Sequence, residues 1–214
     1  MSDHKLPQRM LGRTGLFVPV LGYGTGAIGF GHTAHRDGVA LIQYAMDQGV
    51  TYLDTAHFYE SERMVGDAIA GRRDEVLIAT KTTKRNYDTA LRDIRTSLEL
   101  LGTDRIDVLM FHCVNTLADL DAVLASDGPM KAVQEARKQG TVRFVGITGH
   151  ARPNILALAL ERYPFDVVMS AMGAIDSVVS APELFLVPTA KRAGCGLVAM
   201  KVLGSGKMAG QTEL

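Results

Sequence analysis

The chain has 214 residues, 23 Lys and Arg against 23 Asp and Glu, a formal net charge of zero and 47% hydrophobic residues. These values predict one soluble domain over residues 1–214, and the balanced charge argues against a protein that binds nucleic acid or a membrane through clustered basic residues. No apolar stretch approaches the roughly 20 residues that span a bilayer, and the polar N-terminus lacks the apolar region of a signal peptide. We therefore expect a cytoplasmic protein.

Short apolar runs alternate along the chain with segments of helical periodicity, which is the pattern of strand-helix-strand units around a parallel sheet. Before the first unit, residues 9–20 hold two extended stretches around Arg13-Thr14-Gly15 and predict a hairpin that closes the bottom of a barrel. The predicted strands span residues 20–25, 51–55, 75–80, 105–111, 142–148, 165–170 and 196–202. The predicted helices span residues 36–48, 61–70, 86–102, 129–139, 153–162 and 182–193.

Two fold classes have this alternation, the closed (β/α)8 barrel and the open doubly wound sheet. Residues 24–29 match GxGxxG after a strand, a pattern that binds pyrophosphate in open sheets. In that fold the helix begins within the motif, whereas here helical periodicity starts only near Arg36. The acidic residue expected about 20 positions later would be Asp47 or Asp54, and neither fits well. We therefore favour the barrel.

Polar residues at the ends of predicted strands support a barrel, because active sites of that fold lie at the carboxyl ends of its strands. Asp54, Lys81, His112 and Thr148 end the second, third, fourth and fifth predicted strands. Considered alone, His112 is consistent with a histidine of the core, and Asp54 with Lys81 is consistent with an ion pair that links two strands. Four polar strand ends that converge on one mouth favour a functional site.

Several separated motifs resemble the aldo-keto reductase family. Residues 53–59 (LDTAHFY), with Ser61-Glu62 and Gly66, are similar to its second-strand motif, and residues 78–81 (IATK) to its lysine strand. The remaining matches are residues 105–112 (the histidine strand), 140–148 (the fifth strand), and 9–15 with 22–25 (the hairpin and first strand). The resemblance covers residues 9 to about 208 and implies a TIM-type barrel with an N-terminal hairpin.

The resemblance implies an enzyme that transfers a hydride from NADPH to an aldehyde or ketone, with Asp54, Tyr59, Lys81 and His112 as catalytic residues. Tyr59 would donate the proton to the substrate oxygen, and His112 would orient that oxygen. Lys81, held by Asp54, would lower the tyrosine pKa from its usual value of about 10.

The cofactor-binding residues that the resemblance implies come from several loops. They are Gly24, Thr25, Asp54, Thr148, Met169, Lys201, Leu203, Gly204 and Gly206. Residues 200–207 (MKVLGSGK) resemble the loop that lies along the pyrophosphate, and glycine-rich backbone of this kind can form an anion-binding nest. We expect NADPH in preference to NADH, a small carbonyl substrate and no metal.

The sequence departs from the family pattern at several positions. Gly149 and His150 follow Thr148 where the family has Asn, so one carboxamide contact is either lost or replaced by His150. Met169 and Met172 stand where Gln and a stacking Tyr are usual, and a methionine can still pack on an aromatic face. The usual Gly after Tyr59 is absent, and the loop there is one residue shorter.

The sequence ends soon after the seventh predicted strand, so the barrel is predicted to be incomplete, with about seven strands. Such a sheet leaves an open edge, which proteins avoid or cover. We expect a piece of a longer chain in preference to a barrel that a partner completes, and self-association across the open edge is the second interpretation.

Two other functions remain open. A reductase-like scaffold without catalysis would account for the missing strand and the changed cofactor contacts. A metal-dependent hydrolase would use His57, His112, Cys113 and His150 at one mouth, although no HxH or HExxH spacing occurs. Cys113 and Cys195 occur singly, and we assign them no chemistry.

Overall fold

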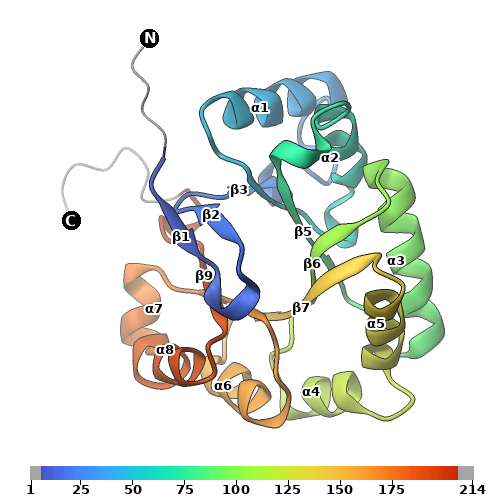
Figure 1. The fold of residues 1–214 in the computed structure, drawn as a ribbon. Helices are drawn as coiled ribbons and strands as arrows, with labels where there is room; N and C mark the ends of the chain where they lie inside the picture. The colour runs from blue at the N-terminus through green and yellow to red at the C-terminus, as the bar shows by residue number, and fades with distance from the viewer. Residues whose placement is uncertain (1–5, 207–214) are drawn as a thin grey trace.

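The structure is a computed structural model that describes residues 6–206, in which parallel strands form one curled sheet with helices around its outside (Figure 1). The strands are β3 (Tyr23–Gly24), β4 (Tyr52–Asp54), β5 (Leu77–Thr82), β6 (Ile106–Phe111), β7 (Val142–Gly149), β8 (Val167–Ala171) and β9 (Gly196–Met200). They lie side by side in chain order, with β3 and β9 at the two edges of the sheet. The predicted architecture, an incomplete TIM-type barrel, is confirmed.

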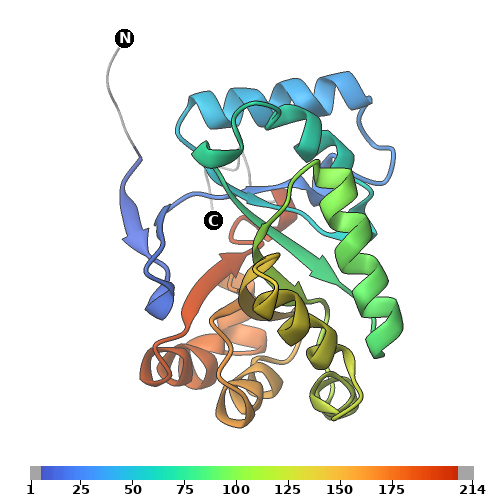
Figure 2. The same cartoon turned by 45° about the vertical axis from the view of Figure 1, so that its right-hand side comes forward.

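The helices that connect these strands pack on the outside of the sheet, where α1 and α2 run side by side (Figure 2). They are α1 (His35–Asp47), α2 (Glu62–Ala68), α3 (Tyr87–Leu101), α4 (Leu117–Leu124), α5 (Pro129–Lys138), α6 (Pro153–Arg162), α7 (Ala174–Val179) and α8 (Pro182–Arg192). Every predicted helix is present, whereas α4 and α7 are not predicted from the sequence. Among residues 6–206, no helix has both the length and the hydrophobicity needed to cross a membrane.

Local sequence signals explain where helices begin and end. At the start of α3 the Asn86 side chain accepts a hydrogen bond from the Thr89 backbone N–H, and Gly102 ends the helix with a φ of 59°. The missed helix α4 has a signal of its own, a reciprocal capping box between Thr116 and Asp119. At eight residues it is too short for its periodicity alone to identify it.

Alternation along each strand divides the core into two parts. One apolar cluster lies between the sheet and the helices, and a second fills the barrel interior. The interior cluster comprises Leu11, Val18, Tyr52, Ala79, Val108, Met110, Val167 and Met169. Because side chains alternate with period two, residues two positions beyond these on β4, β5 and β6 also point inward. Those residues are Asp54, Lys81 and His112.

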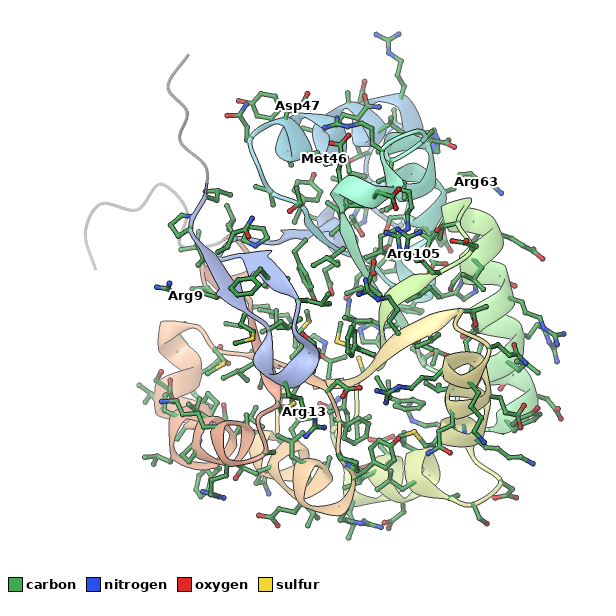
Figure 3. The ribbon with its side chains drawn as sticks, in the orientation of Figure 1. Arg9, Arg13, Met46, Asp47, Arg63 and Arg105 are labelled. Atoms are coloured by element: carbon green, nitrogen blue, oxygen red, sulfur yellow. The ribbon has the colours of Figure 1, made fainter. Side chains whose placement is uncertain are left out.

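The N-terminal hairpin closes the amino-terminal end of the barrel, as predicted. Strands β1 (Gln8–Met10) and β2 (Phe17–Pro19) pair antiparallel, and Leu11 and Val18 belong to the interior cluster. From the turn, Arg13 reaches the protein body and donates hydrogen bonds to the carbonyl oxygens of Pro164 and Phe165 at 2.6 and 2.8 Å (Figure 3).

The first predicted strand is wrong at its start. Val20 and Leu21 are 56% and 57% exposed and precede β3, which comprises only two residues. The prediction included them because they are apolar. In the structure, β3 pairs only with β4 and only through Tyr23 and Gly24, so Val20 and Leu21 lie outside the sheet. Residues 207–214, which include part of the predicted pyrophosphate loop, lie outside the described residues.

Candidate active site

Four polar side chains extend from the carboxyl ends of neighbouring strands. Asp54 ends β4, Lys81 lies on β5, His112 follows β6 and Thr148 lies on β7. Backbone hydrogen bonds continue past the strand ends, from the His112 N–H to the Thr82 carbonyl at 2.8 Å and from the Val114 N–H to the Thr148 carbonyl at 2.8 Å. The register of the parallel strands therefore brings these four residues to the same end of the barrel, as predicted.

Lys81 is a buried cation whose ammonium has two acceptors. The residue is 2% exposed, and its Nζ donates to Asp54 Oδ1 at 2.5 Å and to the Thr55 carbonyl oxygen at 2.7 Å. A buried charge without such partners would cost several kcal/mol. Burial raises the pKa of Asp54, and the Lys81 charge and hydrogen bond oppose that rise. Asp54 Oδ2 is buried and has no hydrogen-bond partner among residues 6–206.

Tyr59 lies over this ion pair. Its ring centroid is 5.1 Å from Lys81 Nζ, and its hydroxyl oxygen is 3.4 Å from His112 Nε2. Burial is the main factor that raises the tyrosine pKa above its usual value, and the charges of Asp54 and Cys113 add to the rise. The net pKa of Tyr59 in this structure is therefore raised and not lowered, and burial is the largest cause.

His112 is held in its neutral form. The residue is 3% exposed, and burial, followed by the positive charge of Lys81 and the neighbouring His150 and Arg85, lowers its pKa to about 3. Arg85 Nη2 also donates to the His112 carbonyl oxygen at 2.6 Å, which fixes the backbone at the end of β6. Near neutral pH His112 can therefore donate or accept a hydrogen bond without carrying a charge.

A buried hydrogen-bond network anchors the segment that carries Tyr59. The Ser61 hydroxyl lies 2.8 Å from Thr25 Oγ1 and 3.0 Å from Thr55 Oγ1. Glu62, 1% exposed, accepts a hydrogen bond from Thr80 Oγ1 at 2.6 Å. Sequence reasoning matched Ser61 and Glu62 to a motif without giving them a role, and the structure shows that they tie the Tyr59 segment to β5 and to the loop after β3.

Two glycines of the GxGxxG match lie against Tyr59. A Cβ on Gly29 would lie 2.1 Å from the Tyr59 carbonyl oxygen, whereas a Cβ on Gly26 would meet the tyrosine ring at an ordinary 3.5 Å. The Phe30 N–H donates to the same carbonyl at 2.8 Å. Gly29 therefore permits a close backbone contact that positions the tyrosine.

Glu60 compensates for the absent glycine by adopting a left-handed conformation, with a φ of 59°. An L-residue with a side chain pays roughly 1–2 kcal/mol for that conformation. The turn that follows Tyr59 is thus retained without the glycine that the family pattern predicts.

The predicted cofactor residues occupy different environments. Thr148 Oγ1 is buried and unpaired within the described residues, so it has hydrogen-bonding capacity for a bound carboxamide. The Thr25 hydroxyl is instead engaged with Ser61, and Met169 is an interior residue with 3% exposure. Gly24 has open space where a Cβ would lie, so a ligand can approach its backbone.

The loop after β9 lies by the same mouth. Lys201, Gly204 and Ser205 have φ values of 58°, 59° and 57°, and the Gly204 N–H donates to the Lys201 carbonyl oxygen at 2.8 Å. The Lys201 charge helps lower the pKa of His150, although burial is the larger cause. Leu203 is exposed, and Gly206 is the last residue described. This backbone and the Thr148 hydroxyl, which has no partner among residues 6–206, supply the kinds of hydrogen-bonding group that a dinucleotide requires.

Three of the four residues considered for a metal site come together. One ligand atom each from His112, Cys113 and His150 lies within 4.8 Å of the others. His57 is elsewhere, with its Nδ1 3.0 Å from Glu62 Oε2, and this contact is the main reason that its pKa is raised.

Comparisons with known proteins identify the family of this chain. The model of the "Aldo/keto reductase family" matches residues 20–213. L-galactose dehydrogenase of Arabidopsis thaliana is 32% identical over 226 residues, which cover 97% of this chain and 68% of the relative.

Two solved structures share the fold. The holo form of an aldo-keto reductase from Bacillus halodurans aligns with a TM-score of 0.84 at 25% identity, covering 98% of this chain and 70% of that one. An aldo/keto reductase from Klebsiella pneumoniae in complex with NADP and acetate aligns with a TM-score of 0.75 at 24% identity, covering 93% and 70%. With its strand-end residues, its hairpin and these matches, the chain belongs to the aldo-keto reductase family and is an oxidoreductase of that family.

Proposed function

We propose that this protein reduces an aldehyde or ketone with NADPH, and that Tyr59, Lys81, Asp54 and His112 are the residues that carry the reaction. The observation that supports it most is the position of the Tyr59 hydroxyl, 3.4 Å from a neutral His112 and above the buried Lys81–Asp54 pair. A proton donor (Tyr59), a hydrogen-bonding group (His112) and a fixed positive charge (Lys81) thus lie close together at the barrel mouth. These are the groups that reduction of a carbonyl requires.

The cofactor, when bound, supplies the hydride that adds to the carbonyl carbon. Thr148 Oγ1 would hold its carboxamide, and the backbone at Gly24 and around Lys201 and Gly204 would contact its phosphates. We infer NADPH rather than NADH from the family resemblance, and NADPH is the first probe because the Klebsiella protein of this fold was solved with NADP.

Tyr59 would give its hydroxyl proton to the carbonyl oxygen as negative charge develops there. Its raised pKa keeps it protonated near neutral pH, and an alkoxide is a stronger base than a phenolate, so the transfer still proceeds downhill. Once the proton has left, the Lys81 ammonium 5.1 Å from the ring stabilises the phenolate electrostatically. By stabilising the phenolate, Lys81 makes Tyr59 a better proton donor and opposes the rise in pKa that burial causes.

Neutral His112 would donate a hydrogen bond to the substrate oxygen and so orient the carbonyl toward Tyr59. Asp54 keeps the ammonium of Lys81 in place, with its Oδ1 2.5 Å from Nζ. Arg85, Ser61 and Glu62 are positioning residues, because each acts through the backbone or a side chain of a neighbour rather than on the substrate.

A titration of the purified chain with NADPH, and separately with NADH, tests the proposal when followed by absorbance decay on addition of an aromatic aldehyde. Saturable NADPH binding with turnover is the expected result. Cofactor binding without turnover of any aldehyde or ketone would favour the non-catalytic scaffold. Sedimentation of the same sample tests the second interpretation of the open sheet edge, which is self-association.

A further inference from the structure

The carboxyl ends of β6 and β7 bring together a donor set that the proposed reaction uses only in part. His112 and Cys113 follow β6, and His150 follows β7. Cys113 has a φ of 56°, so the chain turns there instead of alternating sides as a strand does. Consecutive residues thereby present ligand atoms to one place, where an atom of His150 joins them within 4.8 Å.

Two ring nitrogens in this cluster are buried and have no hydrogen-bond partner in the described part of the chain, namely Nδ1 of His112 and Nδ1 of His150. His112 is 3% exposed, and its other nitrogen faces the Tyr59 hydroxyl. A buried polar atom without a partner carries a desolvation cost that a ligand can remove. The cluster thus holds two histidines with an unpaired ring nitrogen and one thiol, a donor set that suits a ligand accepting lone pairs.

The backbone that carries these side chains is fixed on both sides. Arg85 donates to the His112 carbonyl oxygen at 2.6 Å, and Asn115 Oδ1 accepts from the His150 N–H at 2.9 Å. The ligand atoms are therefore held by a formed scaffold, and only side-chain rotation remains. Cys113 and His150 are half-buried, which leaves room for that rotation.

Two imidazoles and a thiolate are the donors that zinc prefers, whereas magnesium and calcium require oxygen ligands. Ligands at zinc–nitrogen and zinc–sulfur distances of about 2.0 and 2.3 Å lie about 3.5 Å apart in a tetrahedron. The separations here need to contract by no more than about 1.3 Å to reach that geometry. A fourth position would remain for water.

Nearby positive charges limit the affinity of such a site. The charges of Lys81 and Arg85 act on both His112 and Cys113, and Lys201 acts on Cys113 and His150. They disfavour a dication, while the thiolate supplies one compensating negative charge. We therefore expect binding weaker than that of a structural zinc, and reversible on chelation.

We propose that His112, Cys113 and His150 bind a thiophilic divalent cation, Zn²⁺ being the best match, at the carboxyl ends of β6 and β7. On binding, the Cys113 S–H bond breaks, a bond from Sγ to the metal forms and the proton passes to solvent, with no change of oxidation state. Inhibition of carbonyl reduction follows as a consequence that rests on the proposed function, because the metal occupies the residue that orients the substrate.

The first test uses Co²⁺ as a spectroscopic probe of the chelator-stripped protein. Tetrahedral coordination by a thiolate gives a sulfur-to-cobalt charge-transfer band, and the expected result is a saturable band that equimolar Zn²⁺ removes. Cys113→Ser should abolish the band, and His150→Gln should weaken Co²⁺ binding by about tenfold or more.

Cys195→Ser is the matched control, because Cys195 is the other cysteine of the chain and lies buried near the hairpin end. The band should survive that substitution. Absence of a thiolate band in the parent protein, or a band that persists in a folded Cys113→Ser variant, would overturn the proposal whether or not the protein reduces carbonyls.

Activity provides a second readout that is independent of the spectroscopy. Zn²⁺ should inhibit turnover of the parent protein, and a chelator should restore it. Cys113→Ser should retain basal turnover and require at least about tenfold more Zn²⁺ for the same inhibition. Equal inhibition of both proteins would show that zinc acts elsewhere and would contradict the regulatory part of the proposal.

Discussion

The two ends of the barrel differ in how their buried polar groups are hydrogen-bonded. At the amino-terminal end, Asp107 is 1% exposed and accepts hydrogen bonds from Arg73 at 2.8 Å, Arg143 at 2.6 Å and the Ile78 N–H at 2.9 Å. Six buried side-chain atoms have no partner within residues 6–206, and four of them belong to residues at the carboxyl ends of the strands. These four are Asp54 Oδ2, His112 Nδ1, Thr148 Oγ1 and His150 Nδ1, and the other two are Tyr52 Oη in the barrel interior and Arg85 Nε.

This difference suggests that the amino-terminal end contributes mainly to stability and the carboxyl end mainly to chemistry. A carboxylate with both oxygens hydrogen-bonded holds strands together, whereas an unpaired buried atom costs about 1–3 kcal/mol until something binds it. Four such atoms at one mouth indicate that this end is organised for ligands. The same division is general in TIM-type barrels, where function lies at the carboxyl ends of the strands.

Removal of Asp107 should have the largest effect on stability and little effect on chemistry. Asp107→Ala leaves two arginines without their shared partner, and we expect the free energy of unfolding to fall by about 3–5 kcal/mol in urea denaturation. Turnover per folded molecule should be unchanged. Asp104→Ala is the control, because that carboxylate is 88% exposed and its loss should cost less than about 1 kcal/mol. Similar losses from both variants would remove the distinction between the ends.

Gly29→Ala should damage the carboxyl end selectively. The new Cβ would meet the Tyr59 carbonyl oxygen at 2.1 Å, so the tyrosine segment must shift. A displacement of about 1 Å can cost on the order of 10²-fold in turnover, which we expect in kcat. Gly26→Ala, whose Cβ would contact the tyrosine ring at 3.5 Å, should retain most activity. Equal kcat values for the two variants would show that Gly29 does not position Tyr59.

His112 predicts a dependence of stability on pH. The folded protein keeps it neutral down to a pKa of about 3, whereas the unfolded chain binds a proton near the ordinary histidine pKa. Acidification below that value therefore favours unfolding, by about 2 kcal/mol between pH 7 and pH 5. His112→Gln should reduce the loss of stability over this range by that amount in parallel denaturant titrations. An unchanged pH dependence in the variant would mean that His112 binds protons as readily in the folded protein as in the unfolded chain.

Glu60→Gly should have the smallest effect of these substitutions, a small increase in the free energy of unfolding. Glycine adopts the left-handed conformation at φ 59° without the penalty of a side chain, so we expect about 1 kcal/mol of added stability. Glu60→Ala keeps the strain and should give no comparable gain. If alanine stabilised as much as glycine, the side chain of Glu60 rather than its backbone would be the cause.

The fold and the polar strand ends could be predicted from the sequence because both depend on local patterns. The position of Asp54 and Lys81 at the ends of apolar runs placed them at the barrel mouth, and the caps at Asn86 and Gly102 marked a helix. The first strand was placed too early because Val20 is apolar but exposed.

The features that could not be predicted depend on contacts between distant segments. The raised pKa of Tyr59 comes from its burial and from Asp54, and the approach of Cys113 to His150 comes from pairing of β6 with β7. Neither feature can be predicted from the spacing of residues within a single helix or strand. The role of Ser61 and Glu62 likewise appears only once Thr25 and Thr80 are brought beside them.

The most direct test of the division between the two ends is the turnover of Tyr59→Phe, measured with the parent protein under saturating NADPH. Loss of the hydroxyl should lower kcat by about 10²–10⁴-fold, while NADPH binding and the free energy of unfolding stay unchanged. Undiminished turnover would contradict the account, because the proton would then come from another group and the carboxyl-end geometry would not describe the reaction.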